Sequence, residues 1–181
     1  IPASGAQEGK KAISVFKPKV KNYGKNRDIP SLAGTSKFSL FFKNGSLTTS
    51  QVVREMGLQN KNRWTEGEEK FVSEIIWREF YYYILARNPR VENEAFNIQY
   101  KNIKWKNNKI WFQAWKDGQT GFPIVDAGMR ELKETGWMHN RVRMIVASFL
   151  TKDLLIDWRW GEKYFMETLL DGDLAPNNGG W

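Results

Sequence analysis

Residues that mark helix boundaries recur along this chain, between stretches whose apolar positions fit one face of a helix. Two capping boxes, Thr48–Gln51 and Thr65–Glu68, open helices that we expect to end at Gly57 and near Ala86. Further helices are predicted over residues 111–115, 123–136, 139–152 and 160–170, the second of them with a proline in its first turn.

The rest of the chain carries weaker signals. Strand-like alternation is nearly absent, and residues 102–111 form at best a small hairpin. Residues 1–11 are small and polar, which indicates a linker or the frayed entry to a domain. The Lys-rich stretch Lys17–Lys25 is expected to be helical after Pro18, up to residue 26 or 27, and residues 29–39 are expected to form a loop. The predicted fold class is all-α.

The amino-acid composition argues against several classes of function. The 181 residues contain no Cys and one His, which excludes disulfide scaffolds and Cys nucleophiles and argues against multi-His metal centres and a Ser-His-Asp triad. The most apolar uncharged run, Met144–Thr151, is far shorter than the roughly 20 residues of a membrane helix. We therefore expect a soluble, intracellular protein without a resident metal.

Charge and aromatic content add a candidate partner. The net charge of +8 resides in residues 1–90, which carry 16 Lys and Arg against 8 Asp and Glu, and nine Trp are present. A basic half favours a polyanion, most commonly nucleic acid, although many basic proteins are merely soluble.

Two predicted helix faces mix aromatic, polar and charged residues. Glu74, Trp77, Arg78 and Tyr81 form one stripe, which suits a surface that stacks on flat rings and neutralises phosphates. A structural alternative, slightly favoured by the pattern alone, is a Glu74–Arg78 pair over a partly buried Trp77. A second face carries Asn140, Arg143, Met144 and Ala147, with Arg141 to one side and His139 as the expected N-cap.

Two loops offer ligand chemistry. The hydroxyls and amides of residues 35–39 could cradle a phosphate. Asp171 and Asp173 flank Gly172, and sugar hydroxyls or a buried Arg suit these carboxylates better than a metal.

Four longer motifs resemble the flavin domain of DNA photolyases and cryptochromes: WKDGQTGFPIVDAGMR from Trp115, TGWMHNRVRM from Thr135, DWRWGE from Asp157 and DGDLAPNNGGW from Asp171. The resemblance runs from about Tyr23 to Trp181. It implies a linker and basic entry segment over residues 1–22 and a helical FAD-binding domain over residues 23–181, incomplete at its C-terminus. The antenna domain that would bind a second chromophore is missing, so the fragment alone is expected to be inactive.

The resemblance also implies residue roles. Residues that would hold FAD are Tyr23, Thr35, Ser36, Lys37, Phe38, Ser39, Phe71, Arg143, Asp171, Gly172, Asp173 and Asn177. Among them, Arg143 would pair with Asp171. Residues that would line the pocket for a flipped pyrimidine dimer are Glu74, Trp77, Asn140 and Met144, so their two helix faces should converge. Further DNA contacts would come from Arg27, Arg78, Tyr81 and Arg141. A chain of Trp105, Trp158 and Trp181 would carry electrons to the flavin, with Trp105 at the surface.

The implied activity is light-driven repair of cyclobutane pyrimidine dimers by a monomeric enzyme that acts on UV-damaged DNA. One alternative is a cryptochrome, although plant-type receptors tend to carry Asp at the Asn177 position. Photolyases for the (6-4) lesion carry two adjacent His where this chain has His139 and Asn140. The other alternative, a flavin-free helical binder of nucleic acid, would have no need for Arg143, Asp171 and Asn177 together.

Overall fold

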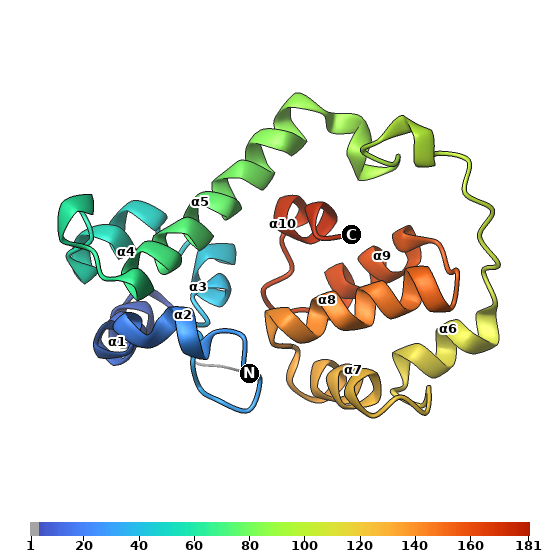
Figure 1. Cartoon of the computed structure of the whole chain (residues 1–181), viewed down its shortest axis with the longest axis horizontal. Helices are drawn as coiled ribbons and strands as arrows, with labels where there is room; N and C mark the ends of the chain where they lie inside the picture. The colour runs from blue at the N-terminus through green and yellow to red at the C-terminus, as the bar shows by residue number, and fades with distance from the viewer. Residues whose placement is uncertain (1–3) are drawn as a thin grey trace. The chain divides into compact units, whose positions relative to one another are not determined.

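The computed structural model describes residues 4–181, and within that range every regular element is a helix. This confirms the predicted all-α class. The chain divides into two compact units, Ile1–Phe80 and Tyr81–Trp181, and the long helix α5 (Glu66–Arg87) contributes to both (Figure 1). The predicted boundary after residue 22 lies inside the first unit, which we call unit 1; the second is unit 2.

Unit 1 contains six short elements before α5. They are α1 (Ala6–Phe16), the 3₁₀ helix η1 (Lys17–Asn22), α2 (Tyr23–Asn26), α3 (Ser39–Lys43), α4 (Thr49–Met56) and the 3₁₀ helix η2 (Lys61–Arg63). The expectation of a linker or frayed entry over residues 1–11 is wrong from Ala6 onward, because α1 begins there and its Gly9 is buried; residues 1–3 lie outside the described range. The helix expected after Pro18 is present, mostly with 3₁₀ geometry.

The capping box at Thr65 forms in full, whereas at Thr48 the N-cap bond forms and the Gln51 side chain donates to Glu55 instead. The Thr48 hydroxyl accepts from the Gln51 amide at 3.1 Å, and α4 ends at Gly57 in the left-handed conformation. At the start of α5 the Glu68 carboxylate accepts from the Thr65 amide at 2.7 Å, while the Thr65 hydroxyl accepts from the Glu68 amide at 3.4 Å. These reciprocal bonds satisfy amides that have no partner within the helix.

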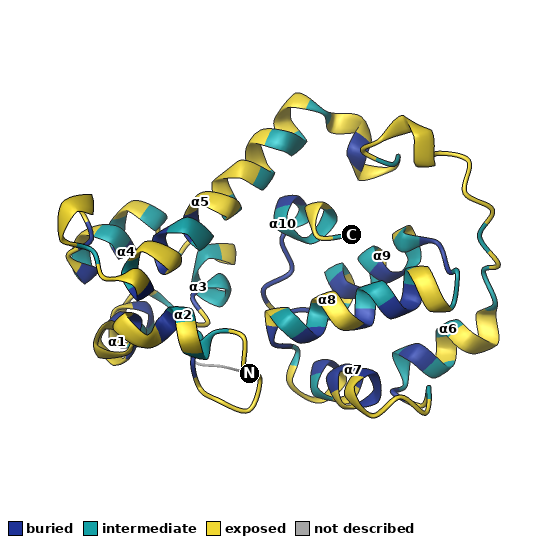
Figure 2. Ribbon diagram, in the orientation of Figure 1, coloured by how far each residue is buried: buried dark blue, intermediate teal, exposed yellow. Residues whose placement is uncertain are grey.

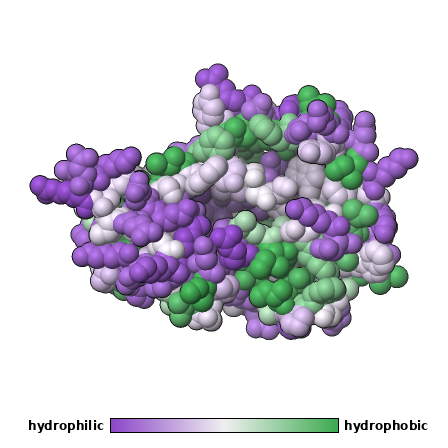
Figure 3. Space-filling model, viewed as in Figure 1, coloured by the Kyte–Doolittle hydropathy of each residue, from purple (hydrophilic) through white to green (hydrophobic). Residues whose placement is uncertain are grey.

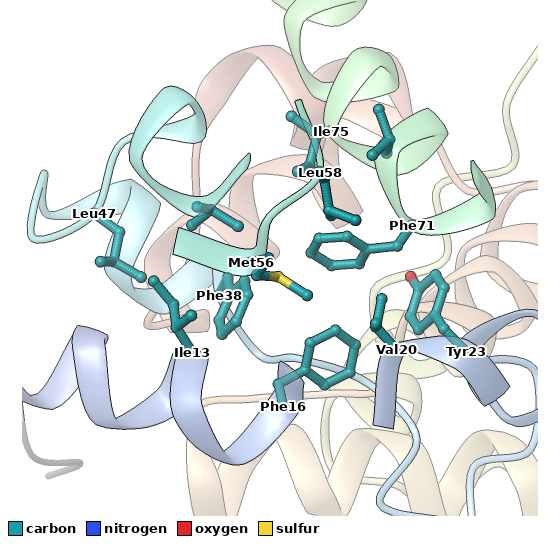
Figure 4. Close-up of a cluster of buried hydrophobic side chains, with 12 residues drawn as sticks. Ile13, Phe16, Val20, Tyr23, Phe38, Leu47, Met56, Leu58, Phe71 and Ile75 are labelled. Carbon is teal, nitrogen blue, oxygen red and sulfur yellow. The ribbon is translucent and has the colours of Figure 1, made fainter. Parts of the chain in front are cut away.

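Four aromatic rings pack together in the core of unit 1. Phe16, Tyr23, Phe38 and Phe71 contact one another with ring centroids 5.2–6.1 Å apart, mostly edge to face (Figure 4). Aliphatic side chains from α1, α4 and the segment after α4 complete the cluster. Buried residues of α5 lie only between Gly67 and Ile75, and the rest of this helix is partly or fully exposed (Figure 2).

Unit 2 continues from the end of α5. Its elements are the 3₁₀ helices η3 (Pro89–Glu92) and η4 (Ile98–Tyr100), α6 (Lys109–Lys116), α7 (Pro123–Thr135), α8 (Asn140–Ser148), the π-helix η5 (Phe149–Asp153), α9 (Trp158–Thr168) and α10 (Leu174–Gly179). The hairpin considered for residues 102–111 is wrong: residues 103–108 have no regular structure and α6 begins at Lys109. The short helix α10 was not predicted.

The core of unit 2 forms where α6, α7, α8 and α9 meet (Figure 1). Trp115 is fully buried there and its indole N–H donates to the Val146 carbonyl at 3.0 Å. Gly128 lets α7 approach α8 closely, because a Cβ at this position would lie 2.4 Å from a methyl of Val142. Among residues 4–181, no helix is long and apolar enough to cross a membrane.

Candidate functional site

Arg143 and Asp171 form an ion pair within unit 2. Arg143, on α8, directs its Nη2 to both carboxylate oxygens of Asp171 at 3.0 Å, and its Nε donates to the Met138 carbonyl at 2.8 Å. Only 2% of the Asp171 side chain is exposed. A buried carboxylate needs such a partner, because removing a charge from water costs several kcal/mol. The predicted contact between these two residues is therefore confirmed.

The turn after Asp171 is tightly packed. Gly172 is buried, and a Cβ there would lie 3.0 Å from the Leu169 carbonyl oxygen. Asp173 is also buried, and one of its carboxylate oxygens accepts from the Tyr82 phenol at 2.5 Å. The carboxylates of Asp171 and Asp173 thus accept hydrogen bonds from side chains of α8 and α5, which lie far away in the sequence.

Asn177, on α10, forms hydrogen bonds with Glu162 of α9. Its amide nitrogen donates to the Glu162 carbonyl at 3.1 Å and to the Glu162 carboxylate at 3.0 Å. Burial raises the pKa of Glu162, and the hydrogen bond from Asn177 offsets part of this rise. Glu162 received no role from the sequence, because no spacing rule relates residues 162 and 177.

Unit 1 contains the other predicted flavin residues. Tyr23 packs against Phe71 with ring centroids 5.5 Å apart, and burial raises the pKa of Tyr23 to about 12. Phe38 and Phe71 are almost completely buried, so their side chains belong to the core. In the loop before α3, the Ser36 hydroxyl accepts from the Phe38 amide at 3.3 Å, and Lys37 has a left-handed φ of 55°. The predicted flavin residues therefore divide between the two units.

Glu74 pairs with Arg27, whose guanidinium also lies 5.4 Å from the centre of the Tyr23 ring. Burial lowers the pKa of Arg27, but the hydrogen bond to Glu74 and the surrounding negative charges outweigh it, so this pKa lies above its ordinary value. Only 12% of the Arg27 side chain is exposed. Its main partner in this structure is Glu74, and a contact of Arg27 with DNA stays a prediction.

The other residues of this face of α5 differ in exposure. Trp77 is 51% exposed and contacts Phe80 edge to face at 5.3 Å. The ion pair of Glu74 is with Arg27, whereas the alternative expected it with Arg78. The Arg78 guanidinium lies 5.5 Å from the Phe42 ring centre. Tyr81 packs against Gly179 of α10, where a Cβ would lie 2.2 Å from its ring.

The exposed face of α8 carries Asn140 and Met144. The Met144 sulfur lies 4.0 Å from the Asn140 amide and 3.6 Å from an Arg141 guanidinium nitrogen. As expected, His139 is the N-cap, and its Nδ1 accepts from the Arg141 amide at 3.1 Å. Hydrophobic residues gather over α7 and α8 (Figure 3), where a groove of about 520 Å³ is lined by residues that include Phe122, Ile124, Met144, Ile145 and Phe149.

The three tryptophans proposed for electron transfer are all half-buried. Trp181 packs against Phe165 and Trp115 with ring centroids 5.1 and 6.5 Å apart. Its ring also fills the space beside Gly161, where a Cβ would lie 2.2 Å from it. The order Trp105, Trp158, Trp181 stays a prediction.

Residues 71–181 match the family model of the FAD-binding domain of DNA photolyase. The chain belongs to this family. A deoxyribodipyrimidine photo-lyase of Neurospora crassa is 47% identical over 98% of this chain and 30% of its own length. The structure of a bacterial class III photolyase from Agrobacterium tumefaciens is similar with a TM-score of 0.92 and 40% identity, over 98% of this chain and 37% of that one.

A cryptochrome from Synechocystis is also similar, with a TM-score of 0.91 and 34% identity over 98% of this chain and 38% of that one. The chain spans about a third of the length of the curated relatives that it matches. The family relationship predicted from the four sequence motifs is confirmed.

Proposed function

We propose that this chain is the flavin-binding part of an enzyme that uses light to split cyclobutane pyrimidine dimers in DNA. The observation that carries this proposal is the family match over residues 71–181, which contains the Arg143–Asp171 pair and Asn177. The name of the Neurospora relative and its 47% identity support dimer repair as the activity.

The polar groups of unit 2 fit a flavin. The ring system of FAD presents carbonyl oxygens, ring nitrogens and one N–H, so it needs both donors and acceptors. Arg143 and Asn177 offer donors, Asp171 and Asp173 offer acceptors, and the side-chain nitrogen of Asn178 is buried without a hydrogen-bond partner. An unsatisfied buried donor is costly unless a ligand or water completes it.

Unit 1 would hold the phosphate and ribityl side of FAD. Thr35 and Ser36, in the loop that leads into α3, and Ser39, the first residue of α3, are half-buried, and Lys37 between them is exposed. When bound and reduced, FAD would transfer one electron to the dimer under light. This electron would return to the flavin after both bonds of the dimer have broken. The protein's task is then to bind, orient and exclude water.

The lesion would meet exposed residues of α5 and α8. Trp77 presents a large apolar ring on which a flipped base can stack, worth about 1–3 kcal/mol per base. Asn140 and Glu74 offer hydrogen bonds to pyrimidine edges, and Arg27 keeps the Glu74 carboxylate in place. A damaged pair costs less to unstack than an intact one, which favours the lesion over normal DNA.

A photoreceptor function is the second candidate, because the Synechocystis cryptochrome shares this fold. The two functions differ in one measurable property. A repair enzyme would give one electron to the lesion and recover it after both bonds have broken, whereas a receptor with the same flavin chemistry leaves the dimer intact.

The test uses the full-length protein with an oligonucleotide that contains one thymine dimer. Under blue light and a reductant, we expect bound FAD and restoration of the intact thymines. Trp77→Ala should weaken binding to dimer-containing DNA far more than to undamaged DNA, whereas the matched control Trp111→Ala should change neither. Bound FAD without repair would support the receptor, and a protein that binds dimer DNA but no FAD would contradict both flavin functions.

A further inference from the structure

Two hydrogen bonds join the irregular segment before α6 to the start of α9. Residues 103–108 have no regular structure, and the amide of Lys106 in this segment donates to the Leu155 carbonyl at 2.8 Å. The Asp157 amide donates to Oδ1 of the Asn107 side chain at 2.9 Å, although the two residues are 50 positions apart. Together these two bonds form the loop–α9 contact.

The backbone on both sides of the loop–α9 contact has an unusual conformation. Asn107 has a φ of 48° and Leu155 a φ of 49°, in the left-handed region that residues other than glycine rarely adopt. Asn tolerates this region better than Leu, and either residue keeps it only where the surrounding structure holds it. The meeting of two such residues indicates that the geometry of this contact is well defined.

The α9 side of the contact is firmly held. Asp157 is the N-cap of α9, and its buried side chain accepts from the Arg159 amide at 3.1 Å. The Arg159 guanidinium also binds this carboxylate, with Nε 3.0 Å from Oδ1, and donates to the Asn93 carbonyl at 3.2 Å. The start of α9 is therefore a fixed support, to which Asn107 attaches the loop through its side chain.

The contact lies between two of the tryptophans proposed for electron transfer. Trp105 precedes Lys106 in the loop, and Trp158 follows Asp157 as the first residue of α9. Both tryptophans are half-buried. Because the loop has no helix that would orient Trp105, the loop–α9 contact constrains where this residue lies relative to α9.

We propose that Asn107 is a positioning residue for light-driven reduction of the flavin, because its hydrogen bond with Asp157 keeps Trp105 within reach of Trp158. This inference rests on the proposed function and on the electron-transfer role proposed for these tryptophans. In that role, one electron would pass from Trp105 to Trp158 and on through Trp181 to the flavin. Trp105 is then oxidised and the flavin reduced by one electron each, and an added thiol reductant restores Trp105.

The test compares Asn107→Gly, Trp105→Phe and the double variant in the full-length protein. Glycine adopts the left-handed backbone of position 107 without strain, so Asn107→Gly removes the side-chain acceptor and keeps the turn. Asn108→Gly is the matched control, because it removes the same side chain from the next residue, where that side chain caps α6. The readouts are hydrogen exchange of the Asp157 amide, transient absorption of the flavin after a light pulse, and dimer repair by chemically reduced protein.

We expect Asn107→Gly to speed exchange of the Asp157 amide and to slow photoreduction of the flavin on the order of 10-fold, because displacing a reacting group by about 1 Å can cost up to about 100-fold. In the Trp105→Phe background, Asn107→Gly should add nothing, since it acts through Trp105. Asn108→Gly should match the wild type in both measurements. Each variant should still repair dimers once it is chemically reduced.

Other outcomes overturn the inference. Unchanged photoreduction in Asn107→Gly, or effects that add fully in the double variant, would show that Asn107 only stabilises the loop. Unchanged photoreduction in Trp105→Phe would remove Trp105 from the pathway and this inference with it. In each case, a wild type that binds FAD and repairs the dimer leaves the proposed function standing, whereas a wild type that binds no FAD contradicts the proposed function itself.

Discussion

Buried charged side chains in unit 2 have partners that compensate the cost of removing a charge from water. The Asp171 carboxylate is shielded from water and depends on Arg143, which reaches it from a helix 28 residues earlier in the sequence. The resemblance to the family predicted this pair. The bonds from Tyr82 to Asp173 and from Asn177 to Glu162 were not predicted, because their partners meet only through the packing of α5, α9 and α10.

Arg143→Ala should destabilise the full-length protein by about 3–5 kcal/mol, because it removes the guanidinium that pairs with the buried Asp171 carboxylate. Urea denaturation measures this free energy of unfolding. The control is Lys163→Ala, which removes an exposed partner of Glu167 and should cost less than about 1 kcal/mol. Equal effects of the two substitutions would mean that Asp171 does not depend on Arg143.

The pH dependence of stability should carry a contribution from Glu162. Burial raises the pKa of Glu162 in the folded state, so folding favours the neutral carboxyl. The folded state is therefore favoured most below the pH at which the unfolded chain titrates this group, near 4.5, and loses this advantage as the pH rises through the folded pKa.

Glu162→Gln should abolish that part of the pH dependence, which unfolding curves between about pH 4 and 7 can measure. Asn177→Ala should raise the pKa of Glu162 further, since it removes the hydrogen bond that lowers it. Carboxyl-carbon NMR of Glu162 reports this directly. A fall of that pKa in Asn177→Ala would refute the assignment.

At the scale of elements, helices with strong local signals were predictable and those without them were not. The boxes at Thr48 and Thr65 and the left-handed Gly57 and Gly136 locate α4, α5 and α7 from short sequence patterns. The helix α10 has no such pattern, because it is only six residues long, with Pro176 in its first turn and Gly179 at its end, and it packs on α9 and α5.

The packing of α5 on η1 gives a prediction for Gly67. A Cβ at this position would lie 2.3 Å from the backbone carbonyl oxygens of Val20 and Lys21, which cannot move without distorting η1. Gly67→Ala should therefore destabilise the protein by about 1–3 kcal/mol or more.

Gly24→Ala is the control, because a Cβ there would meet only the Lys70 side chain at 4.0 Å. Ala also favours a helix over Gly by roughly 0.5–1 kcal/mol, so this variant should be neutral or stabilising. Thermal unfolding of both variants distinguishes the two cases. A stable Gly67→Ala protein would show that α5 and η1 are less closely packed.

At the scale of the whole molecule, the distribution of tryptophans gives a further prediction. Trp105 is half-buried, which suits neither a fully buried core anchor nor a freely exposed ring. If it is the outer member of an electron-transfer chain, Trp105→Phe in the full-length protein should slow light-driven reduction of the flavin. Repair by chemically reduced protein should remain nearly intact.

The control for this prediction is Trp111→Phe, which changes a partly exposed Trp outside the proposed chain. Transient absorption of the flavin after a light pulse measures the reduction rate. Equal rates in wild type and Trp105→Phe would remove Trp105 from the pathway.

The core of each unit is drawn from a separate stretch of sequence, Ile13–Ile75 in one and Trp115–Leu169 in the other. During synthesis, the first stretch is therefore complete roughly ninety residues before the second, a lag of about 5–20 s at ordinary translation rates. The core residues of unit 1 are therefore all synthesised before the first core residue of unit 2. Force measurements on nascent chains should detect a first folding event soon after Ile75 leaves the exit tunnel, and a single late event would contradict this order.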